Sequence, residues 1–241
     1  MTLSSLASAA NAFLTESISA RYSYAFSWLG RPIIQYPQDI VAVQELVWRV
    51  RPDLIIETGI AHGGSLILSA SLLALLDMCD AIDKNWSFNP RESRRRVIGI
   101  DVDIRAHNRH AIETHPMASR IEMIEGSSIA TDVIAAVHER AKPFSTVMVF
   151  LDSNHTHEHV LAELEAYAPL VSPGSYCVVF DTVVENLPKS MFPDRPWGPG
   201  NNPKTAVRDF VSAHPEFQID ADMHNKLLIT VAPDGYLKRT D

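Results

Sequence analysis

One short segment, LDSNHTHEHV at residues 151–160, concentrates side chains that could do chemistry. From His155 to His159 it contains H-x-x-E-H, the order found in one class of zinc peptidases. That chemistry needs both histidines on one face of a settled helix, together with a third ligand. Here His155 comes directly after a predicted strand, at the turn into a helix, and no clear third ligand is present. We therefore favour another use of these histidines, with zinc as the alternative.

Two aspartates each end an apolar run: Asp152 follows VMVFL and Asp181 follows YCVVF. In open α/β sheets, ligands bind at the edge formed by the carboxyl ends of the parallel strands. Neighbouring strands would bring the two carboxylates together, where they repel each other unless they share a proton or a cation. Because the ligands would be oxygen atoms, the pair predicts a hard cation, Mg²⁺ before Ca²⁺ or Mn²⁺.

The histidines beside Asp152 are candidates for a general base. An imidazole can accept a proton near neutral pH. We predict that His155 or His157 faces the same edge as Asp152 and takes a proton there. The simpler alternative for each histidine is a solvated side chain at the start of a helix, for which Thr156 would be the N-cap.

A glycine-rich turn follows an earlier apolar run, in ETGIAHGGS at residues 57–65. Three of the ten glycines lie here, at Gly59, Gly63 and Gly64. Glycines let the backbone approach a ligand, and the amides of the next helix can face it. The dinucleotide fingerprint and the phosphate loop are both absent. A nucleoside without phosphate fits better, and S-adenosylmethionine is the leading candidate; the alternative is a turn that serves only packing.

Two later strand ends extend the same predicted crevice. Asp101 ends RVIGID, and an acid there can accept hydrogen bonds from both ribose hydroxyls of a nucleoside. Its separation from the glycines is about twice the usual twenty residues, and residues 80–93 read as an insertion that accounts for the excess. Ser127, in EGS, would lie on the adenine side. A solvated strand end is the alternative for Asp101.

The elements that position these residues alternate regularly from residue 53 onward. Strands are predicted at 53–57, 96–103, 121–126, 145–152 and 175–181, and helices at 64–77, 105–114, 130–140 and 157–171. Apolar strands alternating with helices indicate a parallel sheet covered on both faces. A helix at 203–213 and strands at 217–222 and 226–232 complete the chain. The predicted fold is α/β, a Rossmann-like doubly wound sheet of five parallel strands plus a C-terminal antiparallel hairpin.

Bulk properties bound the function. We predict an N-terminal helical cap at residues 1–50 and a Rossmann-like domain at 51–241. The net charge of −8 argues against a nucleic-acid partner. The two cysteines, Cys79 and Cys177, lie in apolar runs, as free core thiols of a reducing compartment do. Without a basic start or an apolar run of about 18 residues, we expect a cytoplasmic protein and no membrane span.

A proline-rich segment at residues 185–204 contains five of the fifteen prolines. A loop this long in a compact domain is often a lid or a binding loop. Phe192, Arg195 and Trp197 could cover a sugar face or a flat ring. A rigid surface loop or an oligomer contact is the alternative.

Several separated motifs resemble one family, the cephalosporin hydroxylase / rhamnosyl O-methyltransferase family. They are ETGIAHGGSLILSA, GIDVDIR, FLDSNHTHEHV, VVFDTVVENLP, FPDRPWGPGNNPKTAV and NKLLITVAPDGYLKR, within roughly residues 30–240. The resemblance implies Mg²⁺-assisted methyl transfer from S-adenosylmethionine, with Asp152 and Asp181 as metal ligands. It implies cofactor contacts at Glu57, Gly59, Gly63, Gly64, Ser65, Asp101 and Ser127.

One position departs from that family. Some relatives carry a glutamate immediately before the second aspartate, where this chain has Phe180, so Thr182, Glu185 or water would complete the metal site. The expected reaction is O-methylation of a small hydroxylated acceptor, such as a sugar or glycan, by a homo-oligomer. A hydroxylase or oxidoreductase of a cephalosporin-like metabolite, and a non-catalytic relative that still binds the cofactor, stay open as alternatives.

Overall fold

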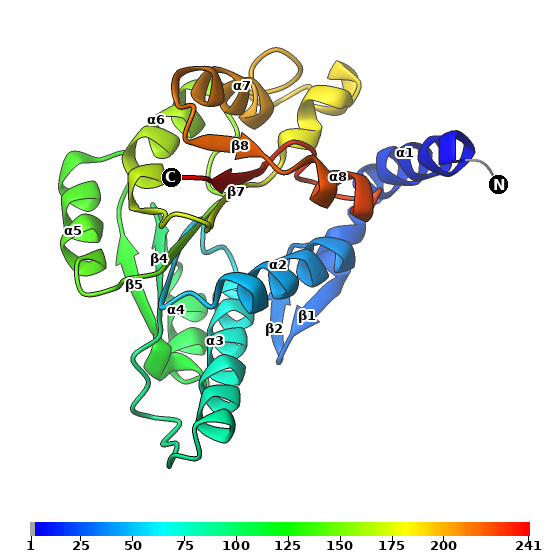
Figure 1. The fold of residues 1–241 in the computed structure, drawn as a ribbon. Helices are drawn as coiled ribbons and strands as arrows, with labels where there is room; N and C mark the ends of the chain where they lie inside the picture. Colours follow the sequence, from blue (N-terminus) through cyan, green and yellow to red (C-terminus); the bar gives the residue numbers. More distant parts are fainter. Residues whose placement is uncertain (1–2) are drawn as a thin grey trace.

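The computed structural model describes residues 3–241, which form a layered α/β fold around one large sheet (Figure 1). The strand order is β5-β4-β3-β6-β7-β9-β8. Five strands are parallel: β3 (Leu54–Thr58), β4 (Arg96–Asp101), β5 (Ile121–Glu125), β6 (Val147–Leu151) and β7 (Tyr176–Val179). Strand β9 (Tyr236–Arg239) pairs antiparallel with both β7 and β8 (Phe217–Ile219). The predicted fold class is confirmed.

Strand side chains alternate between two apolar cores, one on each face of the sheet. In β6, one core receives Val147, Val149 and Leu151, and the other receives Met148 and Phe150. This period of two follows from the pleat of the strand. One face is covered by α2 (Pro37–Val50), α3 (Gly64–Asp83) and α4 (Ala106–Glu113). The other is covered by α5 (Thr131–Ala141), α6 (His157–Tyr167) and α7 (Pro203–Ala213).

The C-terminal strands differ from the prediction. Strand β8 is present, but it is followed by α8 (Ala221–Leu227), and residues 226–232 contain no strand. The strand that pairs with both β7 and β8 is β9, which lies further along the chain. Within the apolar run LLITV, at residues 227–231, Thr230 and Val231 are buried and Leu228 is exposed, and the run forms no strand.

A buried aspartate explains how that run is held. Asp39, on α2, accepts hydrogen bonds from the Thr230 hydroxyl (2.5 Å), the Val231 amide (3.0 Å) and the Tyr236 hydroxyl (2.8 Å). Burial raises the pKa of Asp39 to about 6, although these three hydrogen bonds oppose the rise. The C-terminal segment is thus fixed to α2 by side-chain contacts that replace sheet hydrogen bonds.

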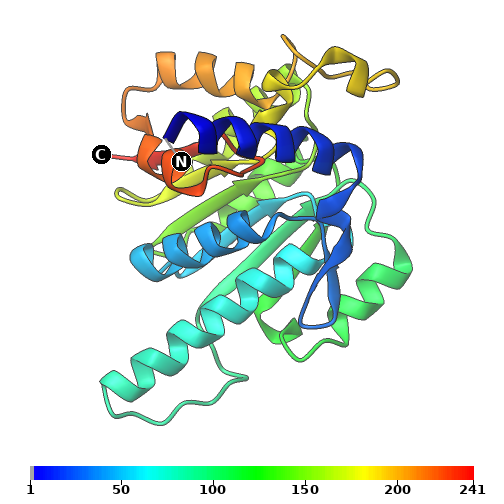
Figure 2. The same cartoon turned by 90° about the vertical axis from the view of Figure 1, so that its right-hand side faces the viewer.

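The N-terminal region contains a hairpin that the sequence did not predict. Helix α1 (Leu3–Ser19) and a 3₁₀ turn, η1 (Tyr22–Ala25), precede β1 (Phe26–Trp28) and β2 (Arg31–Ile33), which pair antiparallel. Figure 2 shows α1 and this hairpin on the same side of the molecule as α2 and α3. Helix α2 packs in the same core as the sheet. The division into a cap and a domain at residue 50 stays a prediction.

Helix α3 is longer than predicted and continues to Asp83. We expected from the sequence no apolar run long enough to cross a membrane. By length and composition alone, this helix could cross one. However, 56% of its most apolar 18-residue window is buried inside the protein. On this helix, Leu66, Ile67 and Leu73 are fully buried. We therefore describe α3 as a core helix.

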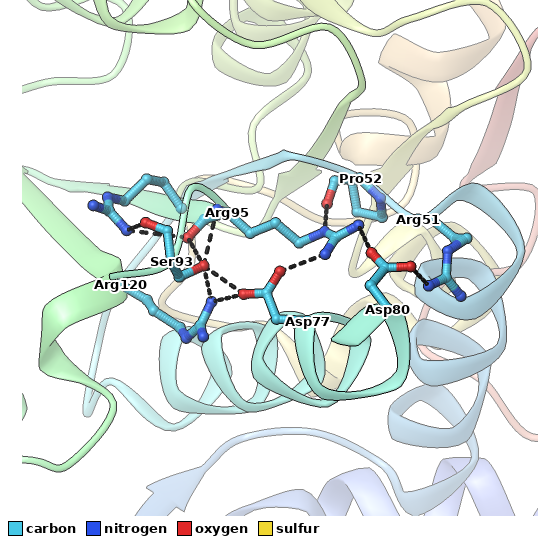
Figure 3. A network of polar contacts seen from close by, with 8 residues as sticks. Arg51, Pro52, Asp77, Asp80, Ser93, Arg95 and Arg120 are labelled. Atoms are coloured by element: carbon cyan, nitrogen blue, oxygen red, sulfur yellow. Dashed lines mark hydrogen bonds and ion pairs between the residues drawn. The ribbon is translucent and has the colours of Figure 1, made fainter. Parts of the chain in front are cut away.

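A polar network connects the end of α3 with the segments that lead into β4 and β5 (Figure 3). The Asp77 carboxylate accepts hydrogen bonds from Ser93 (2.5 Å), Arg120 (2.5 Å) and Arg95. Arg95 also donates to Asp80, at 2.9 Å. Burial alone would raise the pKa of Asp77, but the hydrogen bonds from Ser93, Arg120 and Arg95 outweigh it and lower the pKa. The Arg120 side chain is only 2% exposed, so Asp77 supplies the charge that this buried cation needs.

Asp77→Ala is expected to lower the free energy of unfolding by about 3 kcal/mol, because it leaves Arg120 buried without its carboxylate. Since folding lowers the pKa of Asp77, its contribution is present above about pH 4 and is lost as the pH falls through the folded-state pKa. Urea unfolding at pH 7 measures the change. Asp83→Ala, at an exposed position of the same helix, is the matched control. Equal stability of the two variants would contradict this account of the network.

Candidate active site

Asp152 and Asp181 lie at the carboxyl ends of adjacent parallel strands. Asp152 directly follows β6, and Asp181 lies two residues after β7. One carboxylate oxygen of each lies within 4.8 Å of the other and of a ring nitrogen of His155. The structure thus brings together the two predicted metal ligands and one of the two predicted catalytic histidines.

The charges at this cluster favour a cation. Burial raises the pKa of Asp152 well above its usual range, and the nearby carboxylates of Asp181, Glu57 and Glu163 raise it further. Two close carboxylates can both ionise only when a positive charge offsets their repulsion. Two carboxylate oxygens are a donor set that fits a hard divalent cation such as Mg²⁺ or Mn²⁺. The residues present therefore fit the predicted metal.

Two side chains offered as alternatives for a third metal ligand make contacts elsewhere, so the geometry favours water over them. The Thr182 hydroxyl is buried and donates to the Pro233 carbonyl at 2.7 Å. Glu185 accepts a hydrogen bond from the Gly200 amide at 2.8 Å and so belongs to the proline-rich loop. Phe180 is buried in the apolar core. The remaining coordination positions are left for water or for the acceptor.

The histidines after Asp152 point in different directions. His155 Nε2 lies 3.3 Å from Asp181 Oδ2. His157 faces α7 instead, with Nδ1 2.8 Å from Thr205 Oγ1. Helix α6 begins at His157, so His155 lies in the turn before the helix and His157 lies in its first turn. Successive side chains within the helix are rotated by about 100° around its axis. The geometry does not support the prediction of His157 as a base, and His155 stays the candidate.

The zinc alternative is not supported either. His159 Nε2 lies 3.0 Å from Ser128 Oγ and 3.5 Å from Glu163 Oε1, apart from the aspartate cluster. Within residues 3–241, the cluster of Asp152, His155 and Asp181 is the one group of three candidate metal ligands. The two outer histidines of H-x-x-E-H therefore do not share a site.

The glycine turn lies against the loop that carries Asp152. Gly59 has a φ of +91°, and a Cβ there would come within 2.1 Å of the Asp152 carbonyl oxygen. Only glycine allows both this backbone conformation and this close approach. Asp101 Oδ2 accepts hydrogen bonds from the amides of Ile60 (2.8 Å) and Ala61 (3.1 Å). Asp101 thus holds the turn in place, while its contact with a ribose stays a prediction.

A cleft of about 890 Å³ runs beside the turn and the aspartates. Its volume is within the range of small-molecule sites. Its lining includes residues of the turn and the cluster: Gly59, Gly64, Ser65, Asp152, His155 and Asp181. The N-terminal segment contributes Arg21 and Tyr24, and the proline-rich loop contributes Phe192, Arg195 and Trp197.

The other predicted cofactor residues do not line this cleft. They are Glu57, Gly63, Asp101 and Ser127. Glu57 is 2% exposed and lies beneath the turn, where burial raises its pKa to about 7 against the hydrogen bonds from Ser69 and Ser65. Gly63, with a φ of +82°, comes directly before α3. All seven cofactor contacts stay predictions.

Residues 185–204 are more ordered than the predicted structureless loop. They contain a 3₁₀ turn, η5 (Lys189–Met191), which follows η4 (Thr182–Asn186), and a bridge between Gly198 and Asn201. The Trp197 ring lies 5.2 Å from the His155 ring and 4.9 Å from the Phe192 ring, between centroids. An aromatic surface therefore stands next to the candidate base.

One polar contact of the cluster was missed in the sequence. Gln35 follows β2, lines the cleft and donates from Nε2 to Asp152 Oδ2 at 3.3 Å. No motif marks this residue, because its position depends on the unpredicted hairpin. Its Oε1 atom is buried without a hydrogen-bond partner, so the side chain can accept a further donor in the cleft.

Known proteins are similar to this chain in sequence and in fold. A family model described as Rhamnosyl O-methyltransferase/CmcI matches residues 20–240. A Rhamnosyl O-methyltransferase of Mycobacterium bovis is 27% identical over 206 residues, which cover 83% of this chain and 73% of the relative.

Two solved structures show the same architecture. CmcI in a Mg-SAM form superposes with a TM-score of 0.58 at 16% identity, covering 90% of this chain and 78% of that one. The apo structure of CalS11, a TDP-rhamnose 3′-O-methyltransferase of calicheamicin biosynthesis, gives a TM-score of 0.55 at 17% identity, covering 98% and 93%. At these identities, the likeness concerns the fold.

Proposed function

The chain belongs to the rhamnosyl O-methyltransferase/CmcI family, and we propose that it methylates a sugar hydroxyl, with S-adenosylmethionine as donor and Mg²⁺ at the aspartate pair. The observation that carries the proposal is the convergence of Asp152, Asp181 and His155 at one edge of the cleft, beside the glycine turn. The names of the relatives support an O-methyltransferase and not the hydroxylase alternative, and they point to a rhamnosyl acceptor.

The residues of the cluster have distinct roles. A divalent cation, when bound at Asp152 and Asp181, supplies Lewis-acid polarisation of the acceptor hydroxyl. His155 takes the hydroxyl proton at Nε2, the ring nitrogen that faces Asp181. The acceptor oxygen bonds to the methyl carbon, and the carbon–sulfur bond breaks with its electron pair left on sulfur. The role of the residues that line the cleft is to hold the reacting atoms in line.

Methyl transfer from labelled S-adenosylmethionine to three acceptors tests this function. The acceptors are a simple aryl rhamnoside, a nucleoside-diphosphate rhamnose and a catechol. We expect labelling of at least one rhamnosyl acceptor, its loss with EDTA and its return with Mg²⁺. Labelling of catechol alone would contradict the sugar acceptor. Donor binding without any labelling would contradict catalysis and favour the non-catalytic alternative.

Trp197→Ala is expected to raise the KM for the sugar acceptor roughly tenfold, because an aromatic face that packs against a sugar contributes about 1.4 kcal/mol. Affinity for the donor should stay unchanged, since Trp197 belongs to the proline-rich loop, whereas the donor is proposed to bind at the glycine turn. Steady-state kinetics with varied acceptor measures the effect. Trp86→Ala removes an exposed tryptophan beyond the end of α3 and is the matched control. An unchanged KM in Trp197→Ala would rule out the aromatic platform.

Location and assembly belong to the same proposal. Cys79 and Cys177 are both free, which supports a reducing, cytoplasmic compartment. In the N-terminal region the exposed rings of Phe13 and Tyr22 lie against each other, with 5.6 Å between centroids. Such groups are typical of protein contacts and support a homo-oligomer. Size-exclusion chromatography with light scattering would measure the assembly.

A further inference from the structure

Helix α6 carries three polar side chains that the proposed reaction does not use. His159, Glu163 and Tyr167 are spaced four residues apart and therefore lie along one face of the helix. Glu163 and Tyr167 have no exposed surface, and the His159 side chain is 18% exposed. Buried polar groups are costly unless they are hydrogen-bonded, so their partners define what this face does.

The partners lie in two loops at the carboxyl edge of the sheet. After β5, the Ser128 carbonyl accepts from the Tyr167 hydroxyl at 2.5 Å, and Ser128 Oγ lies 3.0 Å from His159 Nε2. After β6, the Ser153 hydroxyl donates to Glu163 Oε1 at 2.6 Å and lies 3.3 Å from His159 Nε2. His159 thus stands between the two loops, and Glu163 holds one of them.

Each loop leads directly to a residue with a proposed ligand. Ser128 follows Ser127, on the predicted adenine side of the donor, and Ser153 follows Asp152, a proposed metal ligand. Glu163 Oε2 is buried without a hydrogen-bond partner. The carboxylate therefore relies on contacts at Oε1, and a displacement of Ser153 would leave it unsatisfied at a free-energy cost. Glu163 therefore holds the loop after β6 in place, and His159, which contacts both Ser128 and Ser153, connects that loop to the loop after β5.

We propose that His159 and Glu163 are positioning residues that couple donor binding to metal binding. This inference rests on the proposed function. When the donor fixes the loop at Ser128, the contacts through His159 hold Ser153, and with it Asp152, in the arrangement that binds the cation. By linkage, the cation must tighten donor binding by the same factor.

Calorimetric titration with S-adenosylhomocysteine, in EDTA and in saturating Mg²⁺, measures the coupling without turnover. In the wild type, Mg²⁺ should raise the affinity at least about fivefold. The variants His159→Phe and Glu163→Gln should reduce this ratio to less than about twofold. His159→Gln keeps a side-chain donor and should recover much of the ratio. Glu165→Gln, an exposed change on the same helix, should leave the ratio unchanged.

The outcomes separate coupling from simple packing. A ratio that persists in both His159→Phe and Glu163→Gln would overturn the inference, as would a wild-type ratio near one. Equal weakening with and without Mg²⁺ would show a structural role only and would also overturn it. Circular dichroism confirms that each variant is folded. If the wild type does not bind S-adenosylhomocysteine at all, the proposed function fails, which is a distinct result.

Discussion

Asp181→Ala lowers metal-dependent methyl transfer at least about a thousandfold in our account, while affinity for S-adenosylhomocysteine without metal stays within about threefold of the wild type. The first effect follows because the remaining carboxylate, Asp152, cannot hold the cation alone. The second follows because Asp181 lies after β7, whereas the glycine turn follows β3.

Single-turnover assays over a range of Mg²⁺ concentrations, together with calorimetry of donor binding, would measure both effects. Asp209→Ala removes an exposed carboxylate on α7 and is the control, with turnover expected close to that of the wild type. If Asp181→Ala transfers methyl groups at the wild-type rate with the same Mg²⁺ dependence, the aspartate pair is not the metal site.

His155→Ala should lower kcat by about 100-fold to 10,000-fold, the usual contribution of a positioned general base. Binding of donor and acceptor should change little, so the loss appears in kcat more than in KM.

His157→Ala is the matched control for this change, because the two histidines lie two residues apart and face different elements. We expect its turnover to stay within about threefold of the wild type. If His155→Ala and His157→Ala lower turnover equally, His155 is not the general base.

Much of the fold follows from local patterns in the sequence. Strands buried on both faces read as apolar runs, and helices separate them, so the parallel sheet and the strand ends at Asp152 and Asp181 could be predicted. The hairpin β1–β2 could not. Its turn residues, Leu29 and Gly30, both have positive φ, but Leu-Gly lacks the Asn-Gly or Asp-Gly signal of such turns.

At the active site, too, the residues that could not be predicted depend on contacts between distant parts of the chain. Choosing between His155 and His157 requires knowing where α6 begins, since one residue of shift rotates each side chain by about 100°. Glu185 was a candidate ligand because the sequence does not show that the proline-rich loop folds back and brings the Gly200 amide to its carboxylate. The run LLITV was predicted as a strand from its composition, but its position is set by hydrogen bonds from Thr230 and Val231 to Asp39, which is far away in the sequence.

A crystal structure with Mn²⁺ and S-adenosylhomocysteine, together with an anomalous difference map that locates manganese, would decide whether the aspartate pair binds the metal. We predict one manganese peak about 2.2 Å from a carboxylate oxygen of both Asp152 and Asp181, with the sulfur of the ligand over the turn at Gly59. A peak bound elsewhere, or aspartates that point apart while the ligand occupies the cleft, would contradict it.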